Sequence, residues 1–156
     1  MTASRLSSLL SGVAGEYFVA AELSRRGYIA SVTLRNTRGI DILASNTDAT
    51  RSVGIQVKTR QGAETTWVLS KRAEEVPDGD VASNLCYVFV SLNGAEAPSY
   101  YVVPRAIVAS RVSTNHQDWL ASPGKKGQAH RDNPVRNFSD SKGEFRDAWH
   151  RLGLDP

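Results

Sequence analysis

The chain has 156 residues, of which 40% are apolar and 22% charged. This length and composition are typical of one globular domain and exclude a disordered or collagen-like chain. A single cysteine, Cys86, excludes a disulfide within the chain, and no Cys/His spacing typical of a zinc site is present. The net charge of +3 is compatible with a nucleic-acid partner.

Targeting and membrane segments are not expected. No stretch approaches the roughly twenty apolar residues of a membrane span, and Ser7, Ser8 and Ser11 interrupt the N-terminal apolar stretch, unlike a signal peptide. The sequence therefore predicts a cytoplasmic protein without a membrane partner, folded as a single domain over residues 1–156.

The first half of the chain is predicted to contain one helix and four strands. Residues 6–26 form the helix, which Gly27 would end. Its apolar face is expected from residues at the spacing of three and four: Leu6, Leu9, Leu10, Val13, Tyr17 and Ala20. The strands are expected at 28–34, 39–45, 53–60 and 65–70, where apolar residues lie between turn residues.

The second half is predicted to add two strands and two helices. Residues 85–92 are almost continuously apolar, as in a central strand covered on both faces, with Cys86 buried in it. A strand at 99–103, a short helix at 105–111 and a surface loop at 115–130 follow. Ser141 and Glu144 form a capping-box pattern before a final helix, whose apolar face would be Phe145, Ala148, Trp149 and Leu152. The order predicts a mixed α/β domain on one sheet.

Polar residues interrupt two of the predicted strands. Because side chains alternate along a strand, Gln56, Lys58 and Arg60 would share one face while Val57 points to the core. Asp41 lies between two isoleucines, although aspartate is depleted in strands. These residues indicate either a hydrated face of the sheet or a polar site shared by two neighbouring strands.

Glu16 lies within about 60° of the apolar positions of the first helix, at 100° per residue. A charge buried without a partner costs several kcal/mol, so Glu16 needs one. A structural ion pair, a carboxylate at the edge of the core and a functional role all satisfy this need. Gly12 and Ala20, one turn away on either side, leave room beside the carboxylate for an ion or a close backbone.

The ordered set of Glu16, Asp41 and Gln56-Val57-Lys58 resembles the PD-(D/E)XK nuclease superfamily over about residues 12–60. The spacing from Gly12 to Glu16 and the triplet 26–28 are similar to archaeal Holliday-junction resolvases. The glutamine at the first position of Gln56-Val57-Lys58 is similar to that of Mrr-type restriction endonucleases. Further segments are similar to the YraN-like family: Gly15-Glu16, Gly27-Tyr28, Arg35-Asn36, residues 39–44 and residues 57–60. The resemblance implies a restriction-endonuclease-like core, with a central mixed β-sheet flanked by helices.

The resemblance also implies an activity, the Mg²⁺-dependent hydrolysis of phosphodiester bonds in DNA by an endonuclease. Its catalytic residues would be Glu16, Asp41, Gln56 and Lys58. Oxygen atoms of Asp41, Glu16 and Gln56 and the main-chain carbonyl of Val57 would hold Mg²⁺, for which Mn²⁺ is able to substitute. Lys58 would orient the attacking water or stabilise charge on the phosphate.

Gln56 departs from most relatives, which have a carboxylate there, and the loss of one negative charge should weaken metal binding. This departure leaves a second function open, in which a catalytically inactive nuclease fold binds nucleic acid or a protein partner. Nuclease action on RNA is a third alternative, and a homodimer is compatible with the sequence.

Basic residues outside the segment 56–58 are candidates for contacts with DNA phosphates: Arg60, Lys125, Lys126, Arg131 and Arg136. For the late basic stretch the alternative is a solvated loop. The three histidines, His116, His130 and His150, lack metal or triad spacing and are expected at the surface, whereas Trp119 and Trp149 are expected in the core.

Overall fold

The computed structural model describes residues 5–34, 39–76 and 84–155. Arg35 and Asn36, which contribute to the nuclease resemblance, lie outside these ranges. The chain begins with helix α1 (Ser8–Arg25), followed by strands β1 (Ile29–Val32), β2 (Ile42–Ser45), β3 (Ser52–Gln61) and β4 (Thr66–Ser70). After the 3-10 helix η1 (Lys71–Glu74) come β5 (Leu85–Leu92), β6 (Ser99–Pro104), α2 (Arg105–Ala121), β7 (Val135–Ser139) and the 3-10 helix η3 (Trp149–Leu152). All six predicted strands are present.

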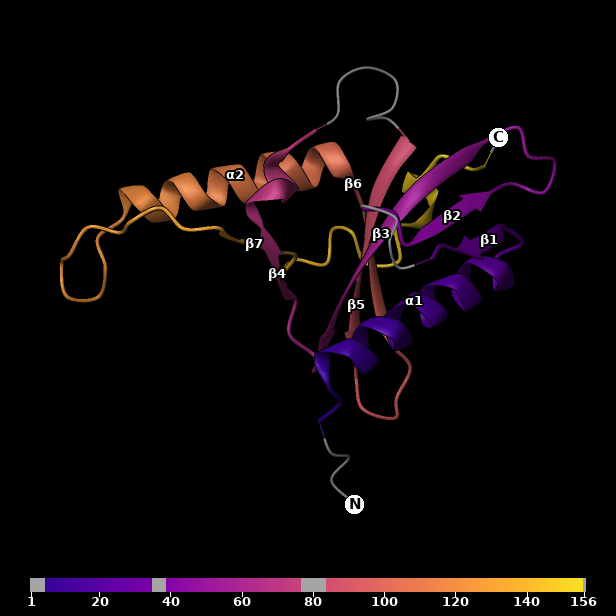
Figure 1. Cartoon of the computed structure of the whole chain (residues 1–156), viewed down its shortest axis with the longest axis horizontal. Helices are drawn as coiled ribbons and strands as arrows, with labels where there is room; N and C mark the ends of the chain where they lie inside the picture. Colours follow the sequence, from indigo (N-terminus) through magenta and orange to yellow (C-terminus); the bar gives the residue numbers. More distant parts are fainter. Residues whose placement is uncertain (1–4, 35–38, 77–83, 156) are drawn as a thin grey trace.

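Five strands form the central sheet in the order β1-β2-β3-β5-β6, and β4 pairs with β7 in a second, two-stranded sheet. β3 and β5 are parallel, whereas the other neighbours are antiparallel. β5 is buried from Cys86 to Leu92, which confirms its predicted central position. Helix α1 lies against one face of the sheet, and α2 with the small sheet lies on the other side (Figure 1). The predicted mixed sheet flanked by helices is therefore confirmed. The prediction of one sheet is wrong for the strand at 65–70, which pairs with β7 outside the central sheet.

The packing of α1 corrects its predicted apolar face. The residues buried against the sheet are Ser11, Gly15, Val19 and Leu23. The predicted face points away, and Leu9, Leu10 and Tyr17 are 62%, 57% and 65% exposed. A Cβ atom on Gly15 would lie 1.8 Å from Oγ1 of Thr59 on β3. The helix therefore packs through its small residues because they let its backbone approach the sheet closely.

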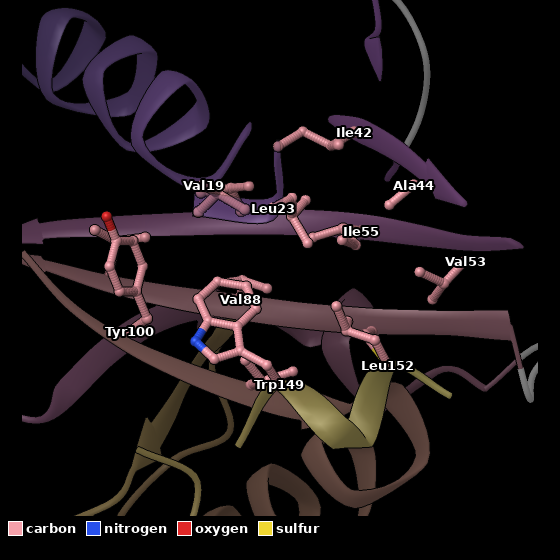
Figure 2. Packing of buried hydrophobic residues seen from close by; sticks show 14 of the residues in the cluster. Val19, Leu23, Ile42, Ala44, Val53, Ile55, Val88, Tyr100, Trp149 and Leu152 are labelled. Carbon is pink, nitrogen blue, oxygen red and sulfur yellow. The ribbon is translucent and has the colours of Figure 1, made fainter. Parts of the chain in front are cut away.

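Two apolar clusters lie on the two faces of the central sheet. The first cluster joins Val19 and Leu23 of α1 to Ile55 and Val88 of the sheet, and Trp149 closes it (Figure 2). The second cluster packs α2 and the small sheet on the other face, with the rings of Phe89, Trp67, Phe138 and Phe145 at its centre. Phe89 and Phe138 stack with centroids 4.5 Å apart and an interplanar angle of 4°. Cys86 is buried in the first cluster as predicted, and burial raises the pKa of its thiol to about 12.

The region after β6 differs most from the prediction. Helix α2 continues to Ala121, beyond the predicted end at residue 111, and occupies part of the predicted loop. Its buried residues are Val108, Ala109, Val112 and His116. This stripe is short and includes a polar residue, so the sequence periodicity ends before the helix does. Strand β7 was not predicted, since its residues alternate in burial but include Arg136 and Asn137. No helix in the described parts of the chain is long and apolar enough to cross a membrane.

The predicted final helix is replaced by a turn and the short 3-10 helix η3. Asp140, rather than Ser141, holds the turn, because its carboxylate accepts hydrogen bonds from the amides of Glu144 and Phe145 at 2.9 and 2.8 Å. The predicted apolar residues are all buried, but Phe145 belongs to the second cluster and Trp149 to the first. A continuous helix would not deliver its side chains to both clusters.

Candidate active site

An open strand edge lies in the middle of the central sheet. β2 pairs with β3 only from Ser52 to Ile55, whereas β5 pairs with the other edge of β3 as far as Gln61. From Gln56 onward, the edge of β3 on the β2 side therefore pairs with no strand in the described parts of the chain. Main-chain groups at such an edge are available to side chains or ligands.

Asp41 occupies this edge, directly before β2. Its amide donates to the carbonyl oxygen of Ile55 at 2.8 Å, although Ile55 is already the partner of Ile42 in the ladder. Two successive residues thus oppose one, as in a β-bulge, which redirects a side chain. Oδ2 of Asp41 accepts a hydrogen bond from the amide of Val57 at 2.7 Å. The Asp41 carboxylate is thereby held where β2 ends and β3 continues.

The arrangement leaves two oxygens at the open edge. Oδ1 of Asp41 has no hydrogen bond to any residue that the structure describes. In an extended strand, the amide and carbonyl of one residue point to the same side, so the carbonyl of Val57 points to the edge where its amide meets Asp41. Hard oxygen atoms of these two kinds are ligands that Mg²⁺ prefers.

Gln56 and Lys58 lie on the face of β3 that points away from α1. They align with Tyr87 and Phe89 of β5, which belong to the second cluster. Gln56, Lys58 and Tyr87 line a cavity of about 590 Å³. Burial raises the pKa of the Tyr87 phenol, the charge of Arg105 lowers this pKa and the charge of Asp41 raises it. Asp41 therefore lies close enough to act electrostatically on the wall of this cavity.

Glu16 is half-buried on α1, next to Gly15, which contacts β3. Ala14 and Phe18 face a cavity beside Leu92 at the end of β5. At 100° per residue, Glu16 lies on the other flank of the helix, toward β1 and β2. This is the flank on which Asp41 lies directly before β2. The convergence of Glu16 on Asp41 and Lys58 stays a prediction.

A second cavity is lined by both α1 and Lys58, and it bears on whether Glu16 converges on Asp41 and Lys58. Ser8 and Ser11 of α1 line it together with Lys58 and Thr59 of β3, in a volume of about 360 Å³. Lys58 therefore borders a cavity on each side of β3. Because no strand covers this stretch of β3, side chains from the two sides of the sheet are able to meet at its edge.

The basic residues predicted to contact DNA fall into three environments. Arg60 is engaged by the turn after β3, where its guanidinium donates to the carbonyl of Thr66 and to Glu64, both at 2.6 Å. Lys125, Lys126 and Arg131 are exposed in the segment between α2 and β7. Contacts between these three exposed residues and DNA phosphates stay a prediction.

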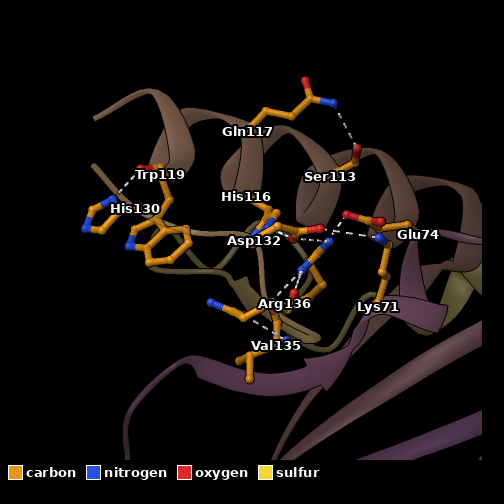
Figure 3. A network of polar contacts seen from close by, with 11 residues as sticks. Lys71, Glu74, Ser113, His116, Gln117, Trp119, His130, Asp132, Val135 and Arg136 are labelled. Carbon is orange, nitrogen blue, oxygen red and sulfur yellow. Dashed lines mark hydrogen bonds and ion pairs between the residues drawn. The ribbon is translucent and has the colours of Figure 1, made fainter. Parts of the chain in front are cut away.

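Arg136 is corrected to a structural residue. Its side chain is 2% exposed, and its Nε donates to Oε1 of Glu74 at 2.5 Å (Figure 3). Its Nη1 donates to the carbonyls of Asn133 and Val135 at 2.6 and 2.9 Å. A guanidinium buried among these acceptors joins β7 to η1 and is not presented to a phosphate.

His116 and Trp119 also depart from expectation. His116 is 8% exposed rather than at the surface, and its Nε2 lies 2.8 Å from Oδ1 of Asp132. Trp119 is 38% exposed rather than in the core, and it stacks on His130 with centroids 4.1 Å apart (Figure 3). Asp132 also meets Lys71 at 3.5 Å. These contacts fasten the segment after α2 to the body of the protein, a function that the charge pattern did not reveal.

The donor set at the open edge fits a hard divalent cation in its chemistry. No group of three or more His, Cys, Asp or Glu side chains that could hold a metal ion occurs within residues 5–34, 39–76 and 84–155. The predicted set contains two carboxylates, with the remaining oxygens supplied by the Gln56 amide and the Val57 carbonyl. These groups are all oxygen donors and therefore suit Mg²⁺ or Mn²⁺ rather than zinc.

Neither protein-family models nor curated proteins match the chain. Among solved structures, it is similar to the bacterial homing endonuclease I-Ssp6803I, with a TM-score of 0.55 and 14% identity over 95% of each chain. It is also similar to Hjc, a Holliday junction resolvase from Archaeoglobus fulgidus, with a TM-score of 0.43, 16% identity and coverage of 83% of this chain and 84% of that one. The chain has a restriction-endonuclease-like fold. The fold class expected from the sequence is thus confirmed.

Proposed function

We propose that this protein, acting as one domain over residues 1–156, is a Mg²⁺-dependent endonuclease that hydrolyses phosphodiester bonds in DNA. The observation that carries the proposal is the Asp41 carboxylate, held by the Val57 amide at 2.7 Å on the open edge of β3. Gln56 and Lys58 follow directly on the same strand. The endonuclease fold raises the expectation of this chemistry, and the residues at the edge supply groups suited to it.

Each residue at the edge has a distinct part. Asp41, the carbonyl of Val57, Gln56 and Glu16 would hold the cation through oxygen atoms. When bound there, Mg²⁺ supplies Lewis acidity to the phosphate and lowers the pKa of an attacking water. Asp41 is oriented by its hydrogen bond to β3, so its free oxygen is placed without further rearrangement.

Lys58 is suited to stabilise the charge that develops on the phosphate. Its side chain borders the cavities on both sides of β3 and forms no ion pair with another described residue. An ammonium group directed at developing negative charge accelerates hydrolysis because it binds the transition state more strongly than the ground state.

Contacts with the DNA backbone would come from Lys125, Lys126 and Arg131, which are exposed. Exposed cations provide most of the sequence-independent affinity for DNA. Because this chain shares its fold with a homing endonuclease, DNA is the first substrate to test.

The test is a cleavage assay on linear, supercoiled and branched DNA with Mg²⁺, Mn²⁺ or EDTA, using purified wild type, Asp41→Asn and Lys58→Ala. We expect nicking that requires the metal and is abolished by Asp41→Asn. Lys58→Ala should slow it by roughly 10²–10³-fold while changing the free energy of unfolding by less than about 0.5 kcal/mol. Cleavage that survives both substitutions undiminished would come from a contaminant and overturn the proposal.

Gln56 is the observation that favours the second function, a catalytically inactive nucleic-acid-binding module. It replaces a carboxylate with a neutral amide at the open edge, and this lowers the negative charge available to a cation. Wild type that binds DNA but cuts no substrate with either metal, and for which Lys58→Ala is silent, would establish this alternative.

A further inference from the structure

The 590 Å³ cavity that Gln56 and Lys58 line is also lined by two arginines that the nuclease resemblance does not include. Arg72 comes from η1, and Arg105 is the first residue of α2. With Lys58, they bring three cationic side chains to one cavity. Among the residues that the structure describes, Glu75 is the single acidic residue that lines it.

Arg105 is oriented by an acceptor that carries no charge. Its Nε donates to the main-chain carbonyl of Glu75 at 3.2 Å, and this neutral carbonyl does not offset the positive charge of the guanidinium. Its Nη1 lies 3.9 Å from the position that a Cβ atom on Gly39 would take. Arg105 therefore reaches across the cavity mouth toward the segment that leads to Asp41.

The side chains of Arg72 and Lys58 form no ion pair or hydrogen bond with any residue that the structure describes. Arg72 is exposed, and Lys58 is half-buried. Several cations outside the cavity do have acidic partners: Arg25 pairs with Glu22, Arg111 with Glu144 and Arg136 with Glu74. A cavity in which cations gather without such partners is suited to an anion from outside the chain.

The same cavity adjoins the cleavage site. Tyr87 lines its wall, and the charges of Arg105 and Asp41 both act on the Tyr87 phenol. Arg105 and the Asp41 carboxylate therefore both act on this wall of the cavity. Because Arg72 and Arg105 line the cavity and Asp41 does not, an anion at the arginines would lie beside, and not at, the group attacked at Asp41.

We propose that Arg72 and Arg105 bind a backbone phosphate adjacent to the phosphate that is cleaved, and so set the position of the DNA strand in the site. The planar guanidinium forks of two arginines match the oxygens of a phosphate, and Arg105 is already oriented for this contact. This inference rests on the proposed nuclease function. It adds a binding subsite and two positioning residues to that function.

The test measures binding in EDTA, where no metal-dependent cleavage occurs, with a short fluorescein-labelled DNA duplex. Fluorescence anisotropy is recorded over a salt series for wild type, Arg72→Ala, Arg105→Ala and Arg105→Lys. Arg146→Ala is the matched control, because Arg146 is an exposed arginine of the segment after β7. Denaturation curves show whether each variant is folded.

We expect Arg72→Ala and Arg105→Ala to weaken binding about tenfold, as for removal of a charge-assisted hydrogen bond. The magnitude of the salt slope should decrease by about 0.9 for each duplex phosphate that the variant no longer neutralises. Arg105→Lys should fall between wild type and Arg105→Ala, since it keeps the charge but not the planar fork. Affinities and slopes equal to those of Arg146→Ala would overturn the subsite. Arg72→Ala keeps this test decisive if Arg105→Ala fails to fold.

A second probe distinguishes an internal phosphate from a strand end. The duplex is prepared with terminal hydroxyl groups and with terminal 5′ phosphates. Equal losses of affinity on both duplexes support an internal backbone phosphate. A loss confined to the phosphorylated duplex assigns the cavity to a strand end and overturns the internal assignment.

Failure of this inference is separable from failure of the nuclease proposal. If wild type cleaves DNA while the arginine variants bind like the control, the subsite fails and the activity stands. If wild type cuts nothing while the arginine variants lose affinity, the phosphate site stands and the activity fails.

Discussion

The amide of Val57 donates a hydrogen bond to Oδ2 of Asp41 at 2.7 Å, across the point where β2 ends and β3 continues. One carboxylate thus accepts a main-chain hydrogen bond of β3, while its other oxygen has no hydrogen bond to a described residue. The structural and chemical roles of Asp41 are separable by substitution.

Asp41→Asn should preserve much of the stability, because an amide oxygen is still able to accept from Val57. Asp41→Ala leaves that amide without an acceptor and should lower the free energy of unfolding by about 1–3 kcal/mol. Both variants should lose metal binding, since both lack the charge. Urea denaturation and calorimetric Mn²⁺ titration measure the two effects. Equal stability of the two variants would contradict the structural role of the hydrogen bond.

Gln56→Glu should tighten Mg²⁺ binding by about tenfold, because an anionic oxygen replaces a neutral one and ligand charge sets affinity. It need not accelerate cleavage, because a more neutralised cation is a weaker Lewis acid. Calorimetric titration of wild type and variant measures the change. Gln117→Glu, which adds the same charge at an exposed position of α2, is the control and should leave the affinity unchanged. A similar gain in both variants would argue against Gln56 as a ligand.

Two glycines of α1 should respond to alanine in opposite directions. Gly15→Ala places a Cβ atom 1.8 Å from Oγ1 of Thr59 and should destabilise the protein by about 1–3 kcal/mol, since a β-branched neighbour yields little. Gly12 has no atom within 4 Å of its Cβ position, so Gly12→Ala should stabilise the helix by roughly 0.5–1 kcal/mol. Thermal denaturation compares them. A neutral Gly15→Ala would show that α1 does not approach β3 this closely.

The basic segment and Arg136 should separate DNA affinity from stability. Replacing Lys125, Lys126 and Arg131 together by alanine should weaken DNA binding and reduce the salt slope by about 0.9 per duplex phosphate left without its cation, with no change in the unfolding midpoint. Arg136→Ala should instead cost about 3 kcal/mol of stability, because it leaves Glu74 without its cation. Anisotropy and denaturation give both readouts. Unchanged affinity and slope in the triple variant would show that the segment is only solvated.

Acid should weaken the attachment of the segment after α2. The hydrogen bond with His116, together with the charge of Lys71, holds the pKa of Asp132 below its usual value of 3.8. A carboxyl with a lowered folded pKa stabilises the protein above its unfolded pKa, and this contribution is lost as pH falls through the folded value. Asp132→Asn should therefore be less stable than wild type at neutral pH and converge with it below pH 3.8. Stability curves that stay parallel across this range would contradict the prediction.

Much of the central sheet could be predicted from local pattern alone. The period of two along β3 separated Gln56 and Lys58 from the core-facing valines, and this separation is present in the structure. The apolar run of β5 indicated a strand buried on both faces, and it is one. Alternation and burial are properties of neighbouring residues in one strand, so a single strand is enough to reveal them.

Helix faces and charge roles could not be predicted in the same way. α1 is apolar on both sides, and the close approach allowed by Gly15 decided which side meets the sheet. Arg136 and Arg131 look alike in the sequence, but one is buried against Glu74 and the other is exposed. Such choices depend on which distant element arrives beside the residue.

The sequence by itself therefore determined the order of the strands from β1 to β6 along the chain, the polar face of β3 and the candidate residues Asp41, Gln56 and Lys58. Only the tertiary structure decided that β2 stops short of Val57, so that an aspartate carboxylate takes the place of a strand at the edge of β3. It also brought Arg105 from α2 to the cavity that Lys58 lines. Strand pairing and cavity walls arise from contacts between residues far apart in the chain, which no local periodicity encodes.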